Sequence, residues 1–187
     1  MLEILLAKNF IYTRSRGLKP TRHSHIAPQI SAVSKPNELR SGSLLGQGLY
    51  FAGEVPHAIS SNGTMHSFMI NPVYAPARIL AGLKLKELAF DTDEAAVAAL
   101  DNLRFVSQEH DLIASLLDKR LINLVGGDIQ HEPLDERIAE AIDLIDDLET
   151  KRVAAGELAE AFSLSESRFL HLFKDELKMT VRKYLLW

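Results

Sequence analysis

The sequence pattern changes at Asp91, and this change constrains the fold more than any other feature. Before Asp91, short apolar runs are separated by clusters of Gly, Pro, Asn and Ser, such as "RSGS" and "SNGT". After it, Ala- and Leu-rich segments follow acidic residues of the kind that begin helices. Short strands joined by turn residues are typical of a small barrel or sandwich, and the later pattern predicts helices. We therefore expect an α+β protein whose β part precedes its helical part.

Six apolar runs are predicted strands, and they are "EILLA", "NFIYT", "IAPQISAV", "GLYFA", "HSFMINPV" and "ARILAGL". Between "HAIS" and "MHSFMI" stands the dipeptide Asn62-Gly63. This dipeptide is a strong signal for a two-residue hairpin turn. The sequence therefore predicts that the strands on its two sides pair with each other.

Three parts follow from the pattern: a β domain at 1–88, a helical connector at 89–127 and a helical domain at 134–187. The connector comprises "DTDEAAVAALDNLRFV" and "SQEHDLIASLLDKRLINLV", and "GGDIQHEP" at 126–133 is the predicted linker. In the segment "LDERIAEAIDLIDDLETK", apolar residues recur every three or four positions and indicate an amphipathic helix. Its acids at 143–149 are expected to form a solvated face. The connector is also a possible dimerisation element, so a homodimer is possible.

Composition excludes several classes of site. The chain has no Cys, so it has no disulfide, thiolate zinc site or cysteine nucleophile. No apolar run is long enough to cross a membrane, and the N-terminus lacks the pattern of a signal peptide. No Ser-His-Asp spacing, phosphate-binding loop or paired-carboxylate motif stands out. We therefore expect a cytoplasmic protein without a membrane partner, without catalytic residues and without enzyme activity.

Residues 156–177, "GELAEAFSLSESRFLHLFKDEL", have the spacing of a helix-turn-helix. Ala159 is the small residue expected where the two helices touch. "SLS" at 163–165 is the predicted turn, and Ser165 is a suitable N-cap for the second helix. The positions expected to be buried are Leu158, Phe162, Leu164, Phe169 and Leu172.

The second of these helices leaves Ser167, Arg168, His171 and Lys174 facing outward. Such a helix can enter a major groove and reach base edges. The last twenty residues carry five basic and two acidic side chains, as phosphate attraction requires, although residues 135–187 as a whole are acidic. An amphipathic helix pair that does not bind DNA has the same spacing, so spacing alone leaves both interpretations open.

The residue identities favour DNA binding, because residues 135–187 resemble the DNA-binding domain of the AraC/XylS family of bacterial transcription regulators. "DERI" matches the opening of that domain, and "TVRKYLLW" resembles the start of its linker helix. The matches to its first helix-turn-helix are Leu158-Ala159, Leu164-Ser165 and Leu172-Phe173-Lys174. By position, the resemblance implies a DNA-contacting set. Its members are Ser165, Glu166, Ser167, Arg168, Leu170, His171 and Lys174.

The chain departs from the family pattern at several positions. Ser163 and Lys178 stand where the family has Gly, and Val181 stands where it has Pro. A positive φ at Ser163 would cost about 1 kcal/mol. Family members carry two helix-turn-helix units, and this chain ends at Trp187, where the linker helix begins. We therefore expect the second unit to be missing, and DNA binding to be weak or dependent on a dimer or on that second unit.

Three histidines in the β domain are candidate binding residues. His23 and His25 form a His-x-His pair, which strand alternation places on one face, and His57 follows in "FAGEVPH". This arrangement resembles the cupin barrel, although Gln29 stands where the metal-binding motif has Glu. The AraC/XylS sensing domain is itself cupin-like, often without a metal. "GEVPHAIS" and "FMINPVYAPARIL" resemble that version.

We therefore expect a cupin-like sensing barrel, a helical connector and a helix-turn-helix domain of three to four helices. His23, His25 and His57 are expected to line a pocket for an unknown small-molecule effector, with no metal and no other cofactor. The predicted function is ligand-responsive, DNA-binding transcription regulation. Two alternatives stay open: a cupin-type metal-dependent enzyme, and an interaction or dimerisation fragment that does not bind DNA.

Overall fold

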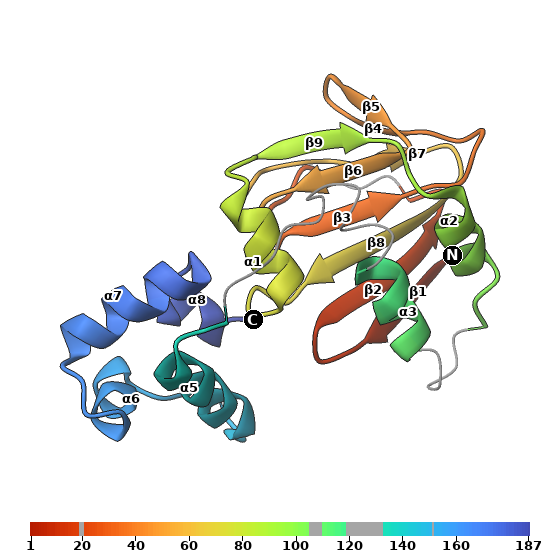
Figure 1. Ribbon diagram of the computed structural model, residues 1–187. Coiled ribbons are helices and arrows are strands. Elements are labelled where there is room, and N and C mark those ends of the chain that lie inside the picture. The colour runs from red at the N-terminus through yellow and green to blue at the C-terminus, as the bar shows by residue number, and fades with distance from the viewer. Residues whose placement is uncertain (19–20, 105–109, 119–132, 151) are drawn as a thin grey trace. The chain divides into compact units, whose positions relative to one another are not determined.

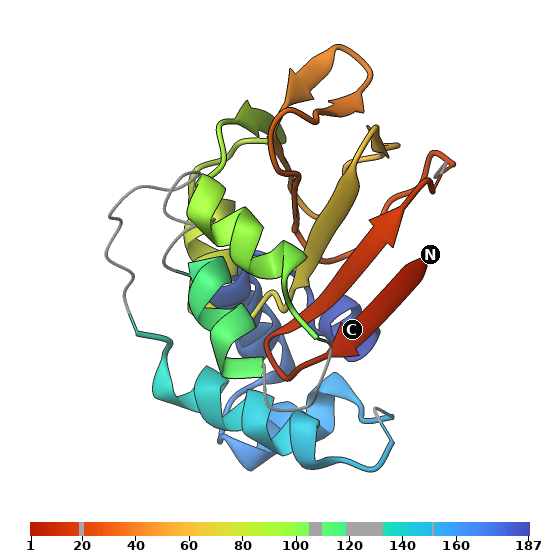
Figure 2. The same cartoon turned by 90° about the vertical axis from the view of Figure 1, so that its right-hand side faces the viewer.

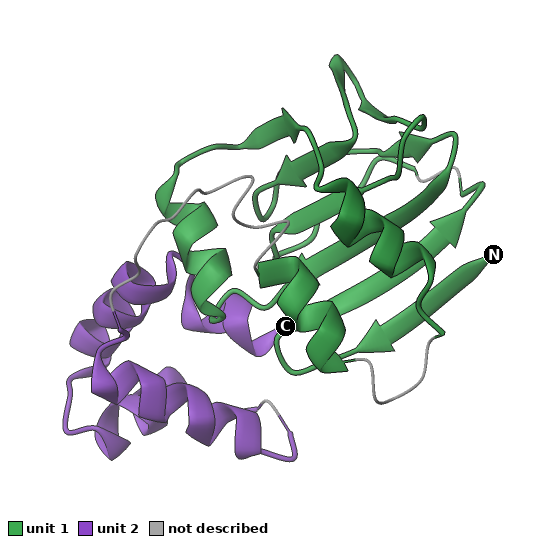
Figure 3. Cartoon of the chain, turned by 45° about the vertical axis from the view of Figure 1, so that its right-hand side comes forward, with its two compact units in different colours: residues 1–130 green, residues 131–187 purple. Residues whose placement is uncertain are grey.

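The computed structural model describes residues 1–18, 21–104, 110–118, 133–150 and 152–187. It divides the chain into two compact units, residues 1–130 and residues 131–187 (Figure 3). Unit 1 contains all the described strands, and unit 2 is helical. The expected α+β class with the β part first is confirmed. The predicted linker at 126–133 lies outside the described residues except for Pro133.

Unit 1 is built on a six-stranded antiparallel sheet (Figure 1). Its strands, in spatial order, are β1 (Leu2–Leu6), β2 (Phe10–Arg16), β8 (Thr64–Ile70), β3 (Gln29–Ala32), β6 (Gly48–Phe51) and β9 (Glu87–Phe90). A smaller sheet has the order β5 (Leu44–Gly46), β4 (Leu39–Ser41) and β7 (Ser60–Ser61). Each pair of neighbouring strands in both sheets is antiparallel.

The expected closed barrel is wrong, because the described strands form two open sheets whose ends, β1 and β9 in the larger one, do not pair. Part of the reason is local. The run "ARILAGL", expected to be a strand, lies in helix α1 (Ala75–Gly82), which begins with a proline in its first turn. Proline is favoured there because its fixed φ suits a helix and its missing N–H has no partner to lose. A short apolar run does not by itself distinguish a strand from a helix.

The hairpin expected at Asn62-Gly63 is also wrong. Strand β7, before the dipeptide, pairs with β4 in the small sheet, whereas β8, after it, pairs with β2 and β3 in the large sheet. Gly63 has no positive φ, which the predicted turn type requires. Instead, a Cβ on Gly63 would lie 2.5 Å from the side chain of Asn37. The glycine therefore serves a close approach between loops.

One face of the large sheet packs against helices. Besides α1, these are α2 (Glu94–Asp101) and α3 (His110–Leu116), and Figure 2 shows them on the same side of the sheet. Side chains from all three helices share one core with the aromatic residues of the strands. Its fully buried members include Tyr12, Phe68, Leu80, Val97 and Ile113. The described part of the predicted connector is thus packed within unit 1.

The opposite face of the large sheet is partly apolar and partly polar. Leu49 and Phe51 from β6 pack with Val33, Leu39 and Ile59 in a second core beside the small sheet. Next to this core, the buried side chains on the same face are polar. They are Gln29 and Ser31 on β3, and Ser67 on β8.

Unit 2 consists of α5 (Glu136–Asp147), α6 (Ala155–Ala161), α7 (Glu166–Leu177) and α8 (Val181–Leu185). Helix α7 contacts each of the other three helices. The buried apolar residues of α5 are Ile138, Ala141, Ile142 and Ile145. They lie at the three- and four-residue spacing that predicted this helix. Among the described helices of the chain, none has the length and apolar character required to cross a bilayer.

Candidate functional site

Helices α6 and α7 form a helix-turn-helix whose turn is closed by a Schellman motif. At the end of α6, the backbone N–H of Leu164 donates to Ala159 O at 2.9 Å, and that of Ser163 donates to Glu160 O at 3.0 Å. This pair of bonds satisfies the last carbonyls of a helix and requires a left-handed residue at the second donor. Ser163 has φ 54° and therefore occupies the left-handed region that favours glycine.

Both ends of α7 are fixed by local backbone structure. At its start, the Ser165 hydroxyl accepts a hydrogen bond from the Arg168 N–H, so the predicted N-cap is present. At its end, Lys178 has φ 55°, again in the left-handed region. The helix is thus bounded by two non-glycine residues in a conformation that glycine adopts more easily. These are two of the positions where the chain departs from the AraC/XylS pattern.

The buried side of the motif agrees with the prediction in part. Leu158, Ala159 and Phe169 are buried, while Phe162, Leu164 and Leu172 are half-buried. Sequence reasoning missed two buried residues of α7, Phe173 and Leu177. The available signal was the spacing of four from Phe169 to Phe173 and again from Phe173 to Leu177. Phe173 lies between Phe169 and Tyr184, with ring centroids 5.9 and 5.8 Å away.

The predicted DNA-contacting residues lie together at the start and along one exposed side of α7. All seven are exposed: Ser165, Glu166, Ser167, Arg168, Leu170, His171 and Lys174. Four of them, Glu166, Ser167, Leu170 and His171, line one shallow surface hollow. The surface therefore combines cationic, hydrogen-bonding and apolar groups, with one carboxylate.

Helix α5 and its N-cap residue Asp135 are tied to the C-terminal helices by two hydrogen bonds. The Tyr184 hydroxyl of α8 donates to Asp146 Oδ1 at 2.9 Å, and burial together with this bond raises the pKa of Tyr184. The backbone N–H of Asp135 donates to Glu176 Oε2 of α7 at 3.3 Å. Asp143, Asp147 and Glu149 are exposed as expected. Asp146 is not merely solvated, because it holds a buried phenol.

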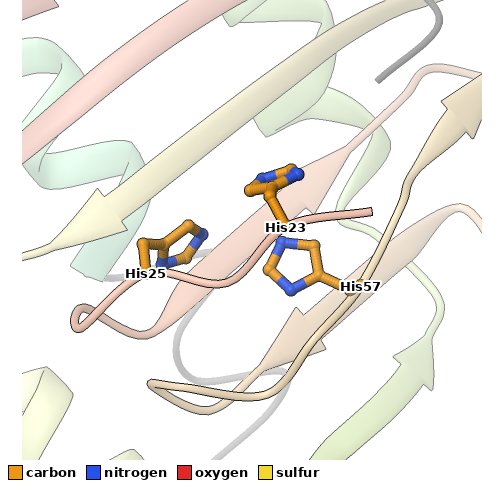
Figure 4. A group of neighbouring side chains, drawn as sticks. All are labelled: His23, His25 and His57. Carbon is orange, nitrogen blue, oxygen red and sulfur yellow. The ribbon is translucent and has the colours of Figure 1, made fainter. Parts of the chain in front are cut away.

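In unit 1, the structure brings His23, His25 and His57 together (Figure 4). They lie in two loop segments rather than in strands, and these segments are joined by an antiparallel bridge between His23 and His57. Both backbone hydrogen bonds of the bridge measure 2.9 Å. One ring nitrogen from each histidine can be chosen so that all lie within 4.8 Å of one another. The expected convergence of a His-x-His pair with a third histidine is therefore present.

Gly53 allows the two histidine-bearing loops to approach each other. A Cβ at this position would lie 2.1 Å from the backbone oxygen of Ile26, so no other residue fits without a shift of the backbone. The next residue, Glu54, has φ 66° and donates its N–H to His25 O at 2.7 Å. The glycine of "FAGEVPH" therefore positions His57 against His25.

Backbone carbonyls fix the orientation of all three imidazole rings. The Nδ1 atoms lie 2.7 to 2.8 Å from carbonyl oxygens, those of Thr21 for His23, Ala27 for His25 and Val55 for His57. A carbonyl oxygen only accepts, so each Nδ1 carries a proton. In a neutral ring the lone pair is then on Nε2, as in histidines that bind a metal through Nε2.

Gln29 connects the histidines to the sheet. Its Oε1 lies 2.7 Å from His25 Nε2 and 3.2 Å from His57 Nε2, and its Nε2 donates to Ser31 Oγ at 2.8 Å. Ser31 Oγ in turn lies 2.8 Å from Ser67 Oγ. Burial lowers the pKa of His57, and the neighbouring His25 and His23 lower it further, against the opposing effect of its bond to Val55.

A surface hollow of about 240 Å³ lies beside His57. Arg22 and Glu87 line it together with Ser41 and Ser43. His23 is exposed, His25 is half-buried and His57 is 3% exposed, so the cluster extends from the surface to the interior. Solvent can therefore reach the cluster from the side of His23.

A second polar group, not predicted as a unit, lies on the helix-covered face of the sheet. His66 Nε2 donates to Asp101 Oδ1 of α2 at 3.0 Å, and the Tyr12 hydroxyl donates to His66 Nδ1 at 2.7 Å. Burial lowers the pKa of His66, and Asp101 opposes this effect. A neutral ring satisfies both bonds, so this group joins α2 to the sheet. Tyr50 is buried on the same face, and burial raises its pKa to about 12.

No protein-family model and no curated protein sequence matches the chain. Solved structures that are similar to it at low identity include the following three. Apo ToxT K231A from Vibrio cholerae strain SCE256 is 12% identical over 96% of this chain and 98% of that chain, with a TM-score of 0.41. The AraC-like transcriptional activator CuxR is 12% identical over 99% and 77%, with a TM-score of 0.42. Unsaturated fatty acid-bound wild-type ToxT from the same strain is 10% identical over 96% of each, with a TM-score of 0.36.

Proposed function

We propose that the protein is a ligand-responsive transcription regulator of the AraC/XylS type, in which α7 enters the DNA major groove. The observation that carries this proposal is the geometry of α6 and α7. A Schellman turn joins the two helices, and α7 presents a continuous exposed side of polar and cationic residues. This is the arrangement through which a helix-turn-helix reads DNA.

Each exposed residue of α7 has a role that follows from its chemistry. Arg168 and Lys174 attract phosphates, and Ser167 and His171 reach base edges through hydrogen bonds. Leu170, 37% exposed, is suited to contact with the methyl group of thymine. Glu166 repels phosphate and lowers the overall affinity. One such helix makes few phosphate contacts, so binding is weak and strongly dependent on salt.

Unit 1 is proposed as the sensor rather than as an enzyme. Its binding groups are the histidine cluster and the adjacent hollow beside His57, which has both signs of charge on its lining from Arg22 and Glu87. An effector that binds one arrangement of the two units more tightly shifts the population toward that arrangement and so changes DNA binding.

DNA binding is tested by selection from a random-sequence duplex library, followed by fluorescence anisotropy on the selected duplex at several salt concentrations. The proposal expects a sequence-selective complex whose log affinity falls linearly with log salt. Lys174→Ala reduces the magnitude of that slope by about 1 and weakens binding to all sequences alike. His171→Ala instead changes which sequences are selected, because base contacts carry specificity.

The matched control is Lys8→Ala, which removes one positive charge from an exposed lysine of unit 1. Its salt slope is expected to equal that of the unchanged chain. If no duplex shows selective, salt-dependent binding, the proposal is wrong. If Lys8→Ala and Lys174→Ala lower the slope equally, then attraction is due to net charge and α7 is not the reading helix.

A further inference from the structure

The Nε2 lone pairs of the histidine cluster meet another acceptor. His25 and His57 hold their protons on Nδ1, because the neighbouring groups are the carbonyl oxygens of Ala27 and Val55. Their Nε2 atoms nevertheless lie 2.7 and 3.2 Å from Gln29 Oε1, which also only accepts. Two acceptor atoms without a hydrogen between them cannot form a hydrogen bond. A positively charged group among them, or a reversed amide, resolves the conflict.

The three rings lie close together, and one of them is shielded from water. His57 is 3% exposed, and ring centroids of His23 and His25 lie 4.7 and 5.1 Å from its own. Phe51 stacks on His57 at 4.3 Å and excludes water from one of its faces. A bound cation uses the lone pairs of all three rings at once.

The donor atoms suit a transition metal. We propose that His23, His25 and His57, through Nε2, and Gln29, through Oε1, bind one divalent first-row transition metal ion. Imidazole nitrogens suit zinc, nickel, cobalt and iron, whereas calcium and magnesium require mainly oxygen ligands. Ligands around such an ion lie roughly 3 to 3.5 Å apart, given metal–ligand bonds of about 2.1 Å. One ring nitrogen from each histidine can be chosen so that these atoms lie within 4.8 Å of one another, so small side-chain movements complete the set.

The surroundings of the proposed ligands resemble those of known metal sites in two respects. Each histidine donates its other ring N–H to a backbone carbonyl, which fixes the tautomer and orients Nε2. Gln29 donates its Nε2 to Ser31 Oγ, which turns Oε1 toward the histidines. The two loops are held at this separation by Gly53 and by the His23–His57 bridge. Exposure of His23 provides the entry path.

The metal is the effector only if the proposed sensing function of unit 1 is correct, whereas metal binding itself depends on unit 1 alone. The test uses the full chain without a histidine tag, treated with a chelator and then titrated with Co²⁺ and Zn²⁺. Calorimetry gives stoichiometry and affinity, and the visible absorption of Co²⁺ reports its ligand geometry. The expected result is one ion per chain with nitrogen-rich coordination.

Single substitutions test which residues bind the metal ion. His23→Ala removes an exposed ligand without disturbing the core, and its affinity is expected to fall at least about 10-fold. His110→Ala makes the same substitution in α3, outside the cluster, and is expected to bind like the unchanged chain. Gly53→Ala keeps all four ligands but forces the loops apart, so its affinity also falls.

Gln29→Glu gives a readout that a purely structural role would not produce. The buried carboxylate lowers the thermal stability of the metal-free protein, and one equivalent of Zn²⁺ restores it because the carboxylate binds the ion more tightly than the amide. Absence of binding, or binding unchanged in His23→Ala, would overturn the proposal. If metal binding is absent but DNA binding is retained, the metal site is wrong and the regulator function stands. If DNA binding is absent but metal binding is retained, only the regulator function is wrong.

Discussion

Replacement of Ser163 by glycine is expected to stabilise unit 2. Ser163 has φ 54° at the end of α6, where its Cβ lies close to the following carbonyl oxygen. A left-handed conformation costs a non-glycine residue about 1 to 2 kcal/mol. Glycine itself lowers the free energy of unfolding by roughly 0.5 to 1 kcal/mol, because it makes the unfolded chain more flexible. The free energy of unfolding should therefore rise by about 0.5 to 1 kcal/mol.

Lys178 offers an independent repetition of the same change. Its φ is 55°, and the side chain adds only an exposed bond from Nζ to Asp175 O at 2.6 Å. Because this bond is lost in Lys178→Gly, the expected gain is slightly smaller than at Ser163. The two sites lie at opposite ends of α7, about 18 Å apart along a twelve-residue helix. Their effects should therefore add, to about 1 to 1.5 kcal/mol in the double variant.

The assay is urea unfolding followed by tryptophan fluorescence. The chain has one tryptophan, Trp187, and it lies in unit 2, so excitation selective for tryptophan follows this unit. The midpoint should move to higher urea without a change of slope. Ser163→Ala is the control, because it removes the hydroxyl and keeps the Cβ. If Ser163→Ala stabilises as much as Ser163→Gly, or if the glycine variant gains nothing, then backbone strain at this turn is refuted.

Two further perturbations test the polar contacts of the two units. Tyr184→Phe removes the hydrogen bond to Asp146 Oδ1. In the same fluorescence assay, the free energy of unfolding of unit 2 should fall by about 1 to 2 kcal/mol. An unchanged free energy would mean that water replaces the bond. Because burial lowers the pKa of His66 in the folded state, its contribution to stability is full above pH 6.5 and is lost as the pH falls toward the lower folded pKa. His66→Gln should reduce the pH dependence of the stability of unit 1 by at most about 1.4 kcal/mol per pH unit. The measurement is unfolding followed by near-ultraviolet circular dichroism of the tyrosines. An unchanged pH dependence would contradict the role of His66.

The helical elements could be predicted because their signals are local. Asp93 caps α2 and Ser165 caps α7, as the capping-type residues indicated. The left-handed conformation at Ser163 could also be anticipated from the sequence, because Ser163 stands where the family pattern has a turn glycine. Barrel closure was not predictable in this way. It depends on pairing between strands far apart in sequence and on which elements cover the sheet, and the run at 77–83 fits a strand or a helix equally well.

The candidate site in unit 1 was predicted as a set of residue types but not as a geometry. Strand-like alternation was sufficient to expect His23 and His25 on one side with His57 opposite. The carbonyls that fix the rings and the contact that requires Gly53 depend on loop conformation, which residue spacing does not encode. The pair of His66 and Asp101 was missed because these residues are 35 positions apart and neither belongs to a recognisable motif.

Gln29, Ser31 and Ser67 form a row of polar side chains with two possible hydrogen-bonding directions, and binding of the proposed ion would select one of them. When Gln29 Oε1 faces a cation, its Nε2 donates to Ser31 Oγ, and the Ser31 hydroxyl then donates to Ser67. Without a cation, the favourable arrangement turns the amide so that its N–H groups meet the imidazole lone pairs. Ser67 then donates to Ser31, and Ser31 donates to the amide oxygen. In each direction the bonds along the row run the same way, and a mixture of the two leaves a buried donor or acceptor unpaired, at a cost of about 1 to 3 kcal/mol. The row from Gln29 to Ser67 is therefore expected to reverse as a unit, so binding of the proposed ion would be transmitted as far as strand β8.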